Sequence, residues 1–411
     1  MGTDVKFLFI HQNFPGQYLY IVKHLLASGQ HDVAFISQPS GSVIPGVRRA
    51  IYTAPTPVVA PIHPNAADFD MMLKRADLVA GLARNLKGLG FEPDIIIGHH
   101  GWGEMLHLVD VWPGVPLLGY FEFFYNHFGQ DVGFDAEFPP AADVSAHLRV
   151  MNTVNLLSHG LKQHGQTPTI WQHTRYPEWF RRDIQVIPEG IYLDLCKPNP
   201  AAFRKTLTVG NFKIGPKDKL VTYVARNLEP YRGVHIMLRA LPALLKRPDV
   251  KVIMIGGDDV SYGPRRSDMS WREYFQKDLI GKYDASRVLM PGQVAYDTYR
   301  DVLQRSDAHV YLTYPFVTSW SLREAMGMGC AIVASDIPAV SEFITHDKTG
   351  ILTPPLDSDM LAENILLLLE DRKLNARLRA AARRYAEATL DNKFYIAAMV
   401  QRIVELTGQV P

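Results

Sequence analysis

A lone carboxylate, Glu324, lies in the run YPFVTSWSLREAMGMG, which begins at Tyr314 and is otherwise small and apolar. The pattern predicts a loop followed by a helix that begins near Ser319 or Ser321. Ser321 and Glu324 have the spacing of a capping box, which stabilises a helix by about 1 kcal/mol. The alternative is a ligand site, because helix amides can hold a phosphate while a carboxylate accepts hydrogen bonds from both hydroxyls of a ribose. The residues leave both interpretations open.

Two arginines follow an apolar run in LVTYVARNLEPYRG. Arg226 ends the predicted strand, and Arg232 precedes Gly233, where a helix is expected to begin. Cations and helix N-terminal amides both favour anions, so this stretch predicts a clamp for a diphosphate. The alternative is a pair of surface arginines that bind Glu229.

Other strand ends in the second half carry small residues. Gly257 follows VKVIMIG, where a glycine lets the backbone approach a ligand or forms a plain turn. Val294 lies in an extended loop after RVLMP that could offer backbone groups to a flat base. Asp258 and Asp259 are interpreted as part of a loop, and no predicted strand ends in a DxD-type metal motif.

The first half of the chain places polar residues after its own predicted strands. His99 and His100 follow DIIIG in GHHGWGE, and two histidines at this position favour a ligand site over a structural role. Glu122 ends PLLGYFEF, where it could orient an acceptor hydroxyl or pair with a neighbouring Arg or His. Trp102 and Trp320 are the candidates for stacking on a sugar.

Parallel sheets are needed to position these residues. Continuous apolar runs separated by helical stretches indicate parallel strands covered on both faces. The alternation pauses over 141–184, which is predicted to be mostly helical, and restarts after CKPNPAAFR, a plausible linker. The fold class is therefore α/β with two doubly wound units joined near 190–200, and ligands are expected beyond the strand ends, in the cleft between the units. The predicted strands are VKFLFI (5–10), DVAFIS (32–37), DIIIG (94–98), PLLGYFEF (116–123), LVTYVAR (220–226), VKVIMIG (250–256), RVLMP (287–291), AHVYLTY (308–314), AIVAS (331–335) and GILTP (350–354).

The composition of the chain argues against several classes of protein. The 411 residues include 47% hydrophobic and 21% charged residues, which is typical of a soluble globular chain. A formal net charge of +1 gives no global electrostatic case for nucleic acid. The two cysteines, Cys196 and Cys330, have no metal-ligand spacing and are interpreted as reduced thiols in a cytoplasmic protein. The first apolar run is too short for a signal peptide or a membrane span.

With these motifs in place, the sequence resembles a retaining glycosyltransferase of family 4 with the GT-B fold, over essentially the whole chain. The segments that carry the resemblance are HQNFPGQ, GHHGWGE, VARNLEPYRG, YPFVTSWSLREAMGMGCAIVASD and DKTGILTP. The resemblance implies two facing Rossmann-like domains. Residues 1–195 would bind the acceptor and 196–391 the nucleotide-sugar donor, with a last helix, about 392–411, packing back on the first domain.

The resemblance also implies site residues. Arg226 and Arg232 match the basic pair that binds the donor diphosphate, Glu324 matches the ribose ligand, and Gly16 matches a glycine loop near the donor phosphates and acceptor. The implied donor-binding set is Gly16, Arg226, Arg232, Gly257, Val294, Phe316, Thr318, Ser319, Trp320, Ser321, Leu322 and Glu324. The implied catalytic set is His99, His100, Glu122, Arg226 and Arg232, with Trp102 and Glu122 on the acceptor side and no metal ligand.

One position departs from the family pattern. The first glutamate of the family's pair would lie eight residues before Glu324, where this chain has Phe316. Its loss puts in doubt the usual contact with the hydroxyls of the donor sugar. Backbone amides of the loop 317–321 could substitute for it.

The function that the resemblance implies is transfer of a hexosyl unit from a UDP- or GDP-sugar to a hydroxyl acceptor, with retention of configuration. The departing phosphate would take the acceptor proton, so neither a metal nor another cofactor is expected. The acceptor would be a glycan, a lipid-linked compound or a small molecule, as in bacterial polysaccharide or glycolipid synthesis. Two alternatives stay open: a non-catalytic nucleotide-sugar-binding partner of a glycan assembly complex, and a sugar-nucleotide epimerase.

Membrane contact is a separate question. The stretch TIWQHTRYPEWFRRD (169–183) mixes aromatic residues with arginines. It predicts an interfacial patch, a lid on the acceptor side, or a packed helical hairpin with solvated arginines. The expected location is the cytoplasm, with peripheral contact at the inner face of the membrane left open.

Overall fold

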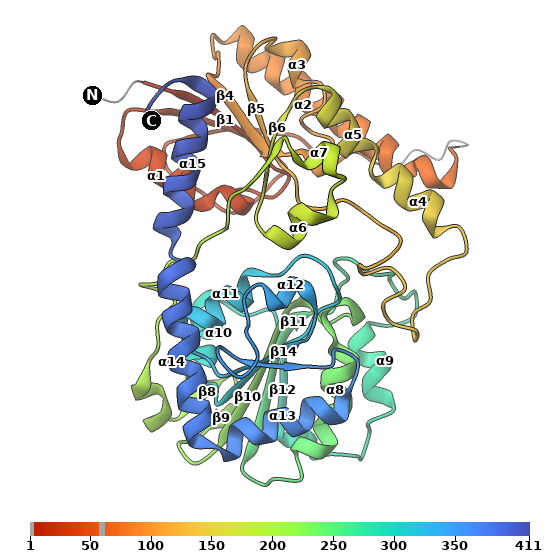
Figure 1. Ribbon diagram of the computed structural model, residues 1–411, viewed down its shortest axis with the longest axis vertical. Helices are drawn as coiled ribbons and strands as arrows, with labels where there is room; N and C mark the ends of the chain where they lie inside the picture. Colours follow the sequence, from red (N-terminus) through yellow and green to blue (C-terminus); the bar gives the residue numbers. More distant parts are fainter. Residues whose placement is uncertain (1–3, 57–61) are drawn as a thin grey trace. The chain divides into compact units, whose positions relative to one another are not determined.

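The computed structural model describes residues 4–56 and 62–411 and divides them into two compact units (Figure 1). Unit 1 takes the chain up to Phe128 together with Phe138–Glu189 and Asn392–Pro411. Unit 2 takes Gly129–Glu137 and Gly190–Asp391. The last helix therefore belongs to unit 1, although most of the second half of the chain precedes it.

Unit 1 is built on a parallel sheet with the strand order β3-β2-β1-β4-β5-β6-β7. Its strands are β1 (Lys6–Ile10), β2 (Asp32–Ser37), β3 (Val47–Ile51), β4 (Ile95–His99), β5 (Leu117–Tyr120), β6 (His164–Thr167) and β7 (Ile184–Val186). Its helices are α1 (Leu19–Ala27), α2 (Ala67–Gly88), α3 (Leu108–Val111), α4 (Val144–Met151), α5 (Thr153–Gly160), α6 (Ile170–Arg175), α7 (Glu178–Arg181) and α15 (Asn392–Thr407).

Unit 2 repeats this plan with the strand order β12-β11-β10-β13-β14-β15 and a small antiparallel hairpin of β8 and β9. Its strands are β8 (Leu207–Val209), β9 (Phe212–Ile214), β10 (Lys219–Asn227), β11 (Val250–Gly257), β12 (Val288–Gly292), β13 (Ala308–Tyr311), β14 (Ile332–Ser335) and β15 (Ile351–Thr353). Its helices are α8 (Val234–Leu244), α9 (Trp271–Lys277), α10 (Tyr296–Arg305), α11 (Trp320–Gly327), α12 (Pro338–Ser341), α13 (Ser358–Glu370) and α14 (Arg372–Thr389).

The central strands are apolar because helices cover both faces of each sheet. In unit 1, Leu8 of β1 and Ile96 of β4 are fully buried and belong to one core cluster with Val79 of α2. In unit 2, Val221 of β10 and Val310 of β13 are also fully buried. The α/β class and the two doubly wound units expected from the apolar runs are thus confirmed.

Each sheet has one point where the strand order changes direction. In unit 1 this point lies between β1 and β4, and in unit 2 between β10 and β13. Ligands of open α/β sheets bind beyond the carboxyl ends of the strands at such a point. His99, the last residue of β4, and Asn227, the last residue of β10, mark these ends.

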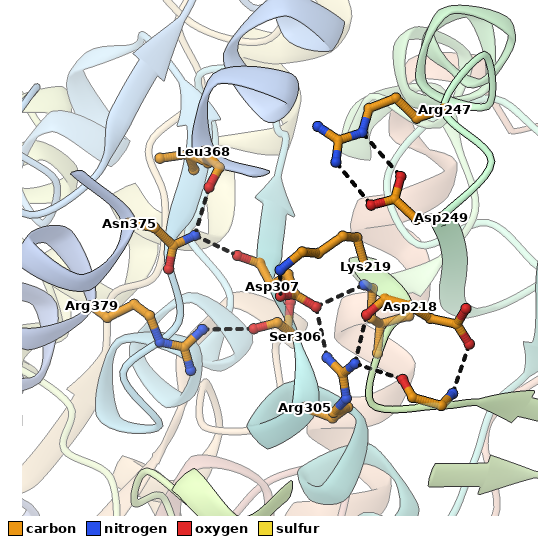
Figure 2. A network of polar contacts seen from close by, with 12 residues as sticks. Asp218, Lys219, Arg247, Asp249, Arg305, Ser306, Asp307, Leu368, Asn375 and Arg379 are labelled. Carbon is orange, nitrogen blue, oxygen red and sulfur yellow. Dashed lines mark hydrogen bonds and ion pairs between the residues drawn. The ribbon is translucent and has the colours of Figure 1, made fainter. Parts of the chain in front are cut away.

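The opposite, amino end of the sheet in unit 2 holds a network of charges that partner one another (Figure 2). Arg305 is almost fully buried, and its Nη1 lies 2.7 Å from Asp307 Oδ2. Lys219, at the start of β10, pairs with the same aspartate at 3.1 Å. From α14, Arg379 donates to the Ser306 carbonyl at 2.7 Å. These cations are used within the fold, in contrast to a cation at the carboxyl end described below.

Three features differ from the sequence prediction. β6 lies within the stretch expected to be mostly helical, because HGQT lacks an apolar run yet pairs in parallel with β5 and β7. β3 and the β8–β9 hairpin were not predicted either, and their mixed composition explains why. Strand context overrides the weak propensity of such short segments.

The segment Gly129–Glu137 corrects the predicted domain boundary, because it belongs to unit 2 rather than to the first domain. Polar side chains bind it there: Tyr231 donates to Asp131 at 2.8 Å, and Tyr314 donates to Asp135 at 2.6 Å. His235 Nε2 lies 2.9 Å from the same Asp135 carboxylate. No apolar run marks this segment, so its side-chain pairing could not be foreseen.

Candidate functional site

The end of β10 and the turn after it carry two arginines in different states. Arg232 is buried, and its Nη1 donates to Thr313 Oγ1 at 2.9 Å and to the Val317 carbonyl at 3.0 Å. Its guanidinium also lies 5.0 Å from the centre of the Tyr262 ring. Arg226 is exposed, and within residues 4–56 and 62–411 it forms neither a hydrogen bond nor an ion pair. The protein thus fixes one cation and leaves the other available.

The alternative partner of these arginines, Glu229, is used elsewhere. Its carboxylate is fully buried and accepts from the backbone N–H groups of Ser261, Tyr262 and Gly263 at 3.1 to 3.3 Å. Glu229 therefore holds the loop that follows β11. The interpretation of Arg226 as a surface partner of Glu229 is wrong.

Gly233 fixes the turn that carries Arg232 into α8. Its φ is +67°, a conformation that favours glycine. A Cβ at this position would lie 2.5 Å from the Cβ of Leu312, which follows β13. The turn after β10 therefore packs directly on the neighbouring strand end, and only glycine fits there.

Glu324 is the fifth residue of α11, and the capping-box interpretation is wrong. Ser319 is the N-cap, and the side chains of Ser319 and Ser321 bond each other at 2.5 Å. The Glu324 carboxylate instead accepts from two hydroxyls of α10, from Tyr296 at 3.0 Å and from Tyr299 at 2.6 Å. Burial raises the pKa of this carboxyl. A built polar cluster, rather than a helix end, surrounds the glutamate.

Access to this cluster runs past Tyr296. Tyr296 is 44% exposed, whereas Glu324 is 8% exposed and Tyr299 is buried. Each carboxylate oxygen has a further lone pair, so a ligand hydroxyl could bind alongside a tyrosine. Cys196 also lies 3.9 Å from Glu324, but burial raises the pKa of its thiol to about 12, which keeps it protonated.

Phe316, which replaces the family's first glutamate, is buried among aromatic rings. Its ring centre lies 4.8 Å from that of Tyr262 and 6.0 Å from that of Tyr231. The position thus packs the loop and offers no polar group. Two residues on, the buried Thr318 hydroxyl has no hydrogen-bond partner in the described part of the chain.

The remaining predicted donor residues of unit 2 lie in the expected loops. Gly257 ends β11, and a Cβ there would lie 2.6 Å from Asn227 Oδ1, so β10 and β11 approach closely. Val294 is half-buried between β12 and α10, and Leu322 is fully buried in α11. Asp258 binds Arg272 through two hydrogen bonds, which agrees with its interpretation as a loop residue.

Unit 1 brings its predicted residues to the end of β4. His99 is buried, and its Nε2 lies 3.4 Å from Glu122 Oε2. Its Nδ1 is buried and has no hydrogen-bond partner among the described residues. Trp102 stacks on the His99 ring with 5.5 Å between ring centres. This group combines a histidine, a carboxylate and an aromatic face.

His100 has a different role from His99. Its Nδ1 lies 2.8 Å from the Tyr120 carbonyl, and its Nε2 lies 2.6 Å from Asn155 Oδ1. Burial lowers its pKa to about 4, so the ring is neutral near pH 7. Both ring nitrogens are used, so His100 positions β5 and α5 and cannot exchange protons with a substrate in this conformation.

Gly16 lies in the loop after β1, at the carboxyl end of the sheet in unit 1. Its φ is +55°, and a Cβ would lie 2.9 Å from the ring of His11. His11 itself is buried and meets His99 edge-on at 5.5 Å between ring centres. His11 was not predicted as a site residue. Its position directly after the first strand is the signal that could have identified it.

Unit 1 also contains a pocket of about 260 Å³. His99, Trp102 and Glu122 line it together with apolar side chains of α2, α4 and α5. Arg75 of α2 also lines it and was missed by the sequence analysis, because a single arginine in a long polar helix carries no motif. The pocket therefore joins the predicted acceptor residues to an unforeseen cation.

Among the described residues, one group has the spacing of metal ligands: Asp135, Glu137 and His235. Arg239 binds Glu137 through two hydrogen bonds of 2.7 and 2.8 Å. Asp135 is bound by His235 and Tyr314. Protein partners thus already use these carboxylates.

The stretch 169–183 forms α6 and α7, a packed helical hairpin. Trp171, Tyr176 and Phe180 are buried, whereas Trp179 is 54% exposed. The packed-hairpin interpretation is therefore confirmed for three of the four aromatic residues. In the described ranges 4–56 and 62–411, no helix combines the length and apolar character of a bilayer span.

Two parallel-sheet units of this topology define the GT-B class, and solved structures with that fold match nearly the whole chain. Sucrose-phosphate synthase from Thermosynechococcus elongatus aligns over 98% of this chain and 99% of its own, with a TM-score of 0.72 and 18% identity. Anabaena HepE in complex with UDP and glucose aligns over 97% and 99%, with a TM-score of 0.67 and 18% identity. At this identity the likeness shows the fold.

Sequence comparison then defines the family. Residues 29–196 match the family model "Glycosyl transferase family 4 group", and 209–385 match "Glycosyl transferases group 1". The chain belongs to the group 1 and family 4 glycosyltransferases of the GT-B fold.

Characterised relatives match parts of the chain. It is similar to phosphatidyl-myo-inositol mannosyltransferase of Mycolicibacterium smegmatis, with 31% identity over 40% of this chain and 39% of that protein. It is also similar to D-inositol 3-phosphate glycosyltransferase of Streptomyces avermitilis, with 24% identity over 60% and 51%. The chain thus spans about half the length of such relatives.

Proposed function

We propose that this protein transfers a hexosyl unit from a nucleoside diphosphate sugar to a hydroxyl acceptor, with retention of configuration. The observation that carries the proposal is Arg226 at the carboxyl end of β10, an exposed cation that has no partner among the residues that the structure describes. Such a cation, next to a switch point of the sheet, suits a ligand with a diphosphate. HepE, a protein with the same fold, was solved with UDP and glucose.

In the proposed reaction the donor C1–O bond breaks and the acceptor oxygen forms the new bond to C1. Negative charge develops on the leaving diphosphate, which Arg226 and Arg232 would stabilise more strongly in the transition state than in the bound donor. The acceptor proton ends on the released diphosphate. Because the arginines supply this positive charge, we infer that the protein needs no divalent metal.

Glu324 would bind the ribose of the donor. The hydrogen bonds from Tyr296 and Tyr299 orient its carboxylate, which is the arrangement that a fixed ligand group needs. In unit 1, Glu122 and His99 would receive the acceptor, with Glu122 orienting the hydroxyl that attacks. The proposed acceptor is a glycan, a lipid-linked compound or a small molecule.

The test is thermal unfolding with a panel of UDP-, GDP- and ADP-sugars, for the wild type, Glu324→Ala and the control Glu363→Ala. A ligand at a hundred times its Kd stabilises a protein by about 2.7 kcal/mol, which gives a readable shift. We expect one sugar nucleotide to shift the wild type and Glu363→Ala, and to shift Glu324→Ala less. If the sugar nucleotide shifts Glu324→Ala as much as the wild type, Glu324 does not bind the donor.

Phe316 favours one second candidate, a non-catalytic binder of nucleotide sugars, because it removes the polar group that the family uses at the donor sugar. Release of nucleoside diphosphate, with and without acceptor extracts and with and without EDTA, separates the two. Transfer to a new product that resists EDTA supports the enzyme without a metal. Donor binding with no turnover supports the binder, and interconversion of the donor sugar supports an epimerase.

A further inference from the structure

Unit 1 contains a second pocket, of about 500 Å³, which the function proposed above does not use. Residues of the stretch after β5 form one part of it, and residues of α4 and α5 form the other. Tyr125 lines this second pocket and also the smaller pocket that holds His99 and Glu122, where the acceptor is proposed to bind. The second pocket and this acceptor pocket are therefore neighbours that share a wall.

Two asparagines fix the shared wall. The side chain of Asn152 donates to the Tyr125 carbonyl at 2.8 Å and accepts from the Tyr125 N–H at 2.9 Å. Asn155, which lines the acceptor pocket, donates to the Asn152 side chain at 3.2 Å, and its Oδ1 lies 2.6 Å from His100 Nε2. The same hydrogen bonds thus position both pockets, and a ligand longer than one ring can extend from one to the other past Tyr125.

Aromatic side chains supply the apolar part of the second pocket. Phe128 is 82% exposed, and Phe124 and Tyr125 are half-buried. The Phe128 ring meets the His127 ring edge-on, with 4.2 Å between ring centres, so one side of it is supported. An exposed aromatic ring in a pocket offers a flat apolar face, against which the C–H face of a sugar ring packs.

Polar groups lie beside these rings. Ser145 Oγ lies 2.9 Å from His127 Nδ1. Neither the other ring nitrogen of His127 nor the exposed guanidinium of Arg149 has a hydrogen-bond partner within residues 4–56 and 62–411. A hydrocarbon chain would cover these groups without offering them partners, which is costly. A sugar ring brings hydroxyls that both donate and accept, so the pocket favours carbohydrate.

We infer that the second pocket binds the sugar unit that follows the reacting sugar of an oligosaccharide acceptor. This inference rests on the proposed function, because it extends the site at which that function places the acceptor. The reacting ring would lie in the acceptor pocket with a hydroxyl toward Glu122. The next ring would lie on Phe128 with its hydroxyls toward Arg149. Of the three proposed kinds of acceptor, the second pocket thus favours the glycan.

The experiment is calorimetric titration of the full chain, with the donor site saturated by UDP or GDP. The probes are glucose, mannose and N-acetylglucosamine, each beside its dimer and trimer: maltose and maltotriose, mannobiose and mannotriose, chitobiose and chitotriose. A glycan array supplies the probe if none of these binds. Octyl glucoside, below its micelle concentration, tests a hydrocarbon chain in place of the second sugar.

Two variants remove groups of the second pocket, and each has a matched control. Phe128→Ala removes the exposed ring, and its control is Leu89→Ala, at a position of unit 1 that is 83% exposed. Arg149→Ala removes the guanidinium, and its control is Arg84→Ala, at an exposed arginine of α2. Sugar-nucleotide binding verifies that each variant is folded.

We expect at least one series in which the dimer or trimer binds the wild type roughly tenfold more tightly than the monosaccharide. Phe128→Ala should abolish most of this gain and Arg149→Ala part of it, whereas both controls should keep it. The affinity for the monosaccharide should be the same in all variants, because the acceptor pocket is unchanged. A purely structural role of Phe128 would not alter the dependence on chain length.

Three results would overturn the inference. The first is that longer oligomers bind no more tightly than the monosaccharide, and the second is that the gain survives both Phe128→Ala and Arg149→Ala. The third is a gain from the octyl chain that equals the gain from a sugar unit and is lost in Phe128→Ala, which would assign the pocket to a hydrocarbon chain.

The same titrations separate this inference from the proposed function. If no saccharide binds to a protein that still binds its sugar nucleotide, the second pocket is not an acceptor site, and the proposed function stands. Loss of both kinds of binding would contradict the proposed function too.

Discussion

Among the side chains of unit 2 that we propose bind the donor, some are held in place by other protein groups and one is exposed. Arg232 is fixed by Thr313 and the Val317 carbonyl, whereas Arg226 is exposed. Glu324 is oriented by two tyrosines of a neighbouring helix. Because these side chains are already ordered, donor binding has a smaller cost in conformational entropy.

The hydroxyl of Tyr299 is expected to stabilise the buried Glu324 carboxylate. Tyr299→Phe removes the 2.6 Å hydrogen bond and leaves a buried charged acceptor poorly satisfied, which costs about 1–3 kcal/mol. Urea unfolding measures this cost. Tyr296→Phe is the matched control, because its hydroxyl belongs to a half-exposed side chain, and it should cost less. Equal costs for the two variants would contradict this account of Glu324.

The sequence could predict which residue types gather at the strand ends, but not which of them the protein itself binds. Arg226 and Arg232 looked equivalent in VARNLEPYRG, and only packing separates them. His99 and His100 also looked equivalent until Asn155, far along the chain, was found to bind one of them. Tertiary partners of this kind leave no local pattern.

At the scale of elements, the turn from β10 into α8 depends on Gly233. Gly233→Ala should destabilise unit 2 by more than the roughly 1–3 kcal/mol of a left-handed residue, because its Cβ would also meet Leu312. Gly210→Ala is the matched control: its φ is +58° and nothing lies within 4 Å of the added Cβ. Denaturant unfolding measures both costs. Gly210→Ala reports the backbone strain alone, and Gly233→Ala reports the same strain together with the steric clash. If Gly233→Ala costs no more than Gly210→Ala, the close packing is wrong.

The segment Gly129–Glu137 should make unit 2 sensitive to acid. Burial would raise the pKa of Asp135, but hydrogen bonds from His235 and Tyr314 hold it at about 2, below the ordinary 3.8. A lowered carboxyl pKa stabilises the folded state above pH 3.8, and this contribution is lost as the pH falls toward 2. Asp135→Asn should therefore lower stability at pH 7 and flatten its pH dependence between 4 and 2. Unfolding curves at several pH values test this, and an unchanged slope would refute it.

The elements themselves were partly predictable. Runs such as VKVIMIG predict buried parallel strands because both of their faces are apolar, and β11 confirms this. HGQT of β6 and the segment Gly129–Glu137 were missed, since the partners of polar residues lie far away in sequence. The last helix, expected at about 392–411, is confirmed by α15 (Asn392–Thr407).

At the scale of the whole molecule, the division into two units should appear in unfolding. Each unit has its own core, so heating should give two transitions, and the sugar nucleotide should raise only that of unit 2. Met399 of α15 is fully buried in unit 1. Met399→Ala should therefore reduce the free energy of unfolding of unit 1 by about 2–5 kcal/mol and lower only the transition temperature of that unit. Met360→Ala, at a partly exposed site of α13, is the control. One shared transition that moves with both changes would contradict this division.

The most direct test of the central claim, that Arg226 binds a donor diphosphate, is calorimetric titration with UDP and GDP and with the free nucleosides uridine and guanosine. The variants are Arg226→Ala and the control Arg204→Ala, an exposed arginine elsewhere in unit 2. A charge-assisted hydrogen bond contributes about 1.5–3 kcal/mol, so Arg226→Ala should weaken nucleoside diphosphate binding roughly 10- to 100-fold. Nucleoside binding and the control variant should be unchanged. Nucleoside diphosphate affinity that is the same with and without Arg226 would contradict the account.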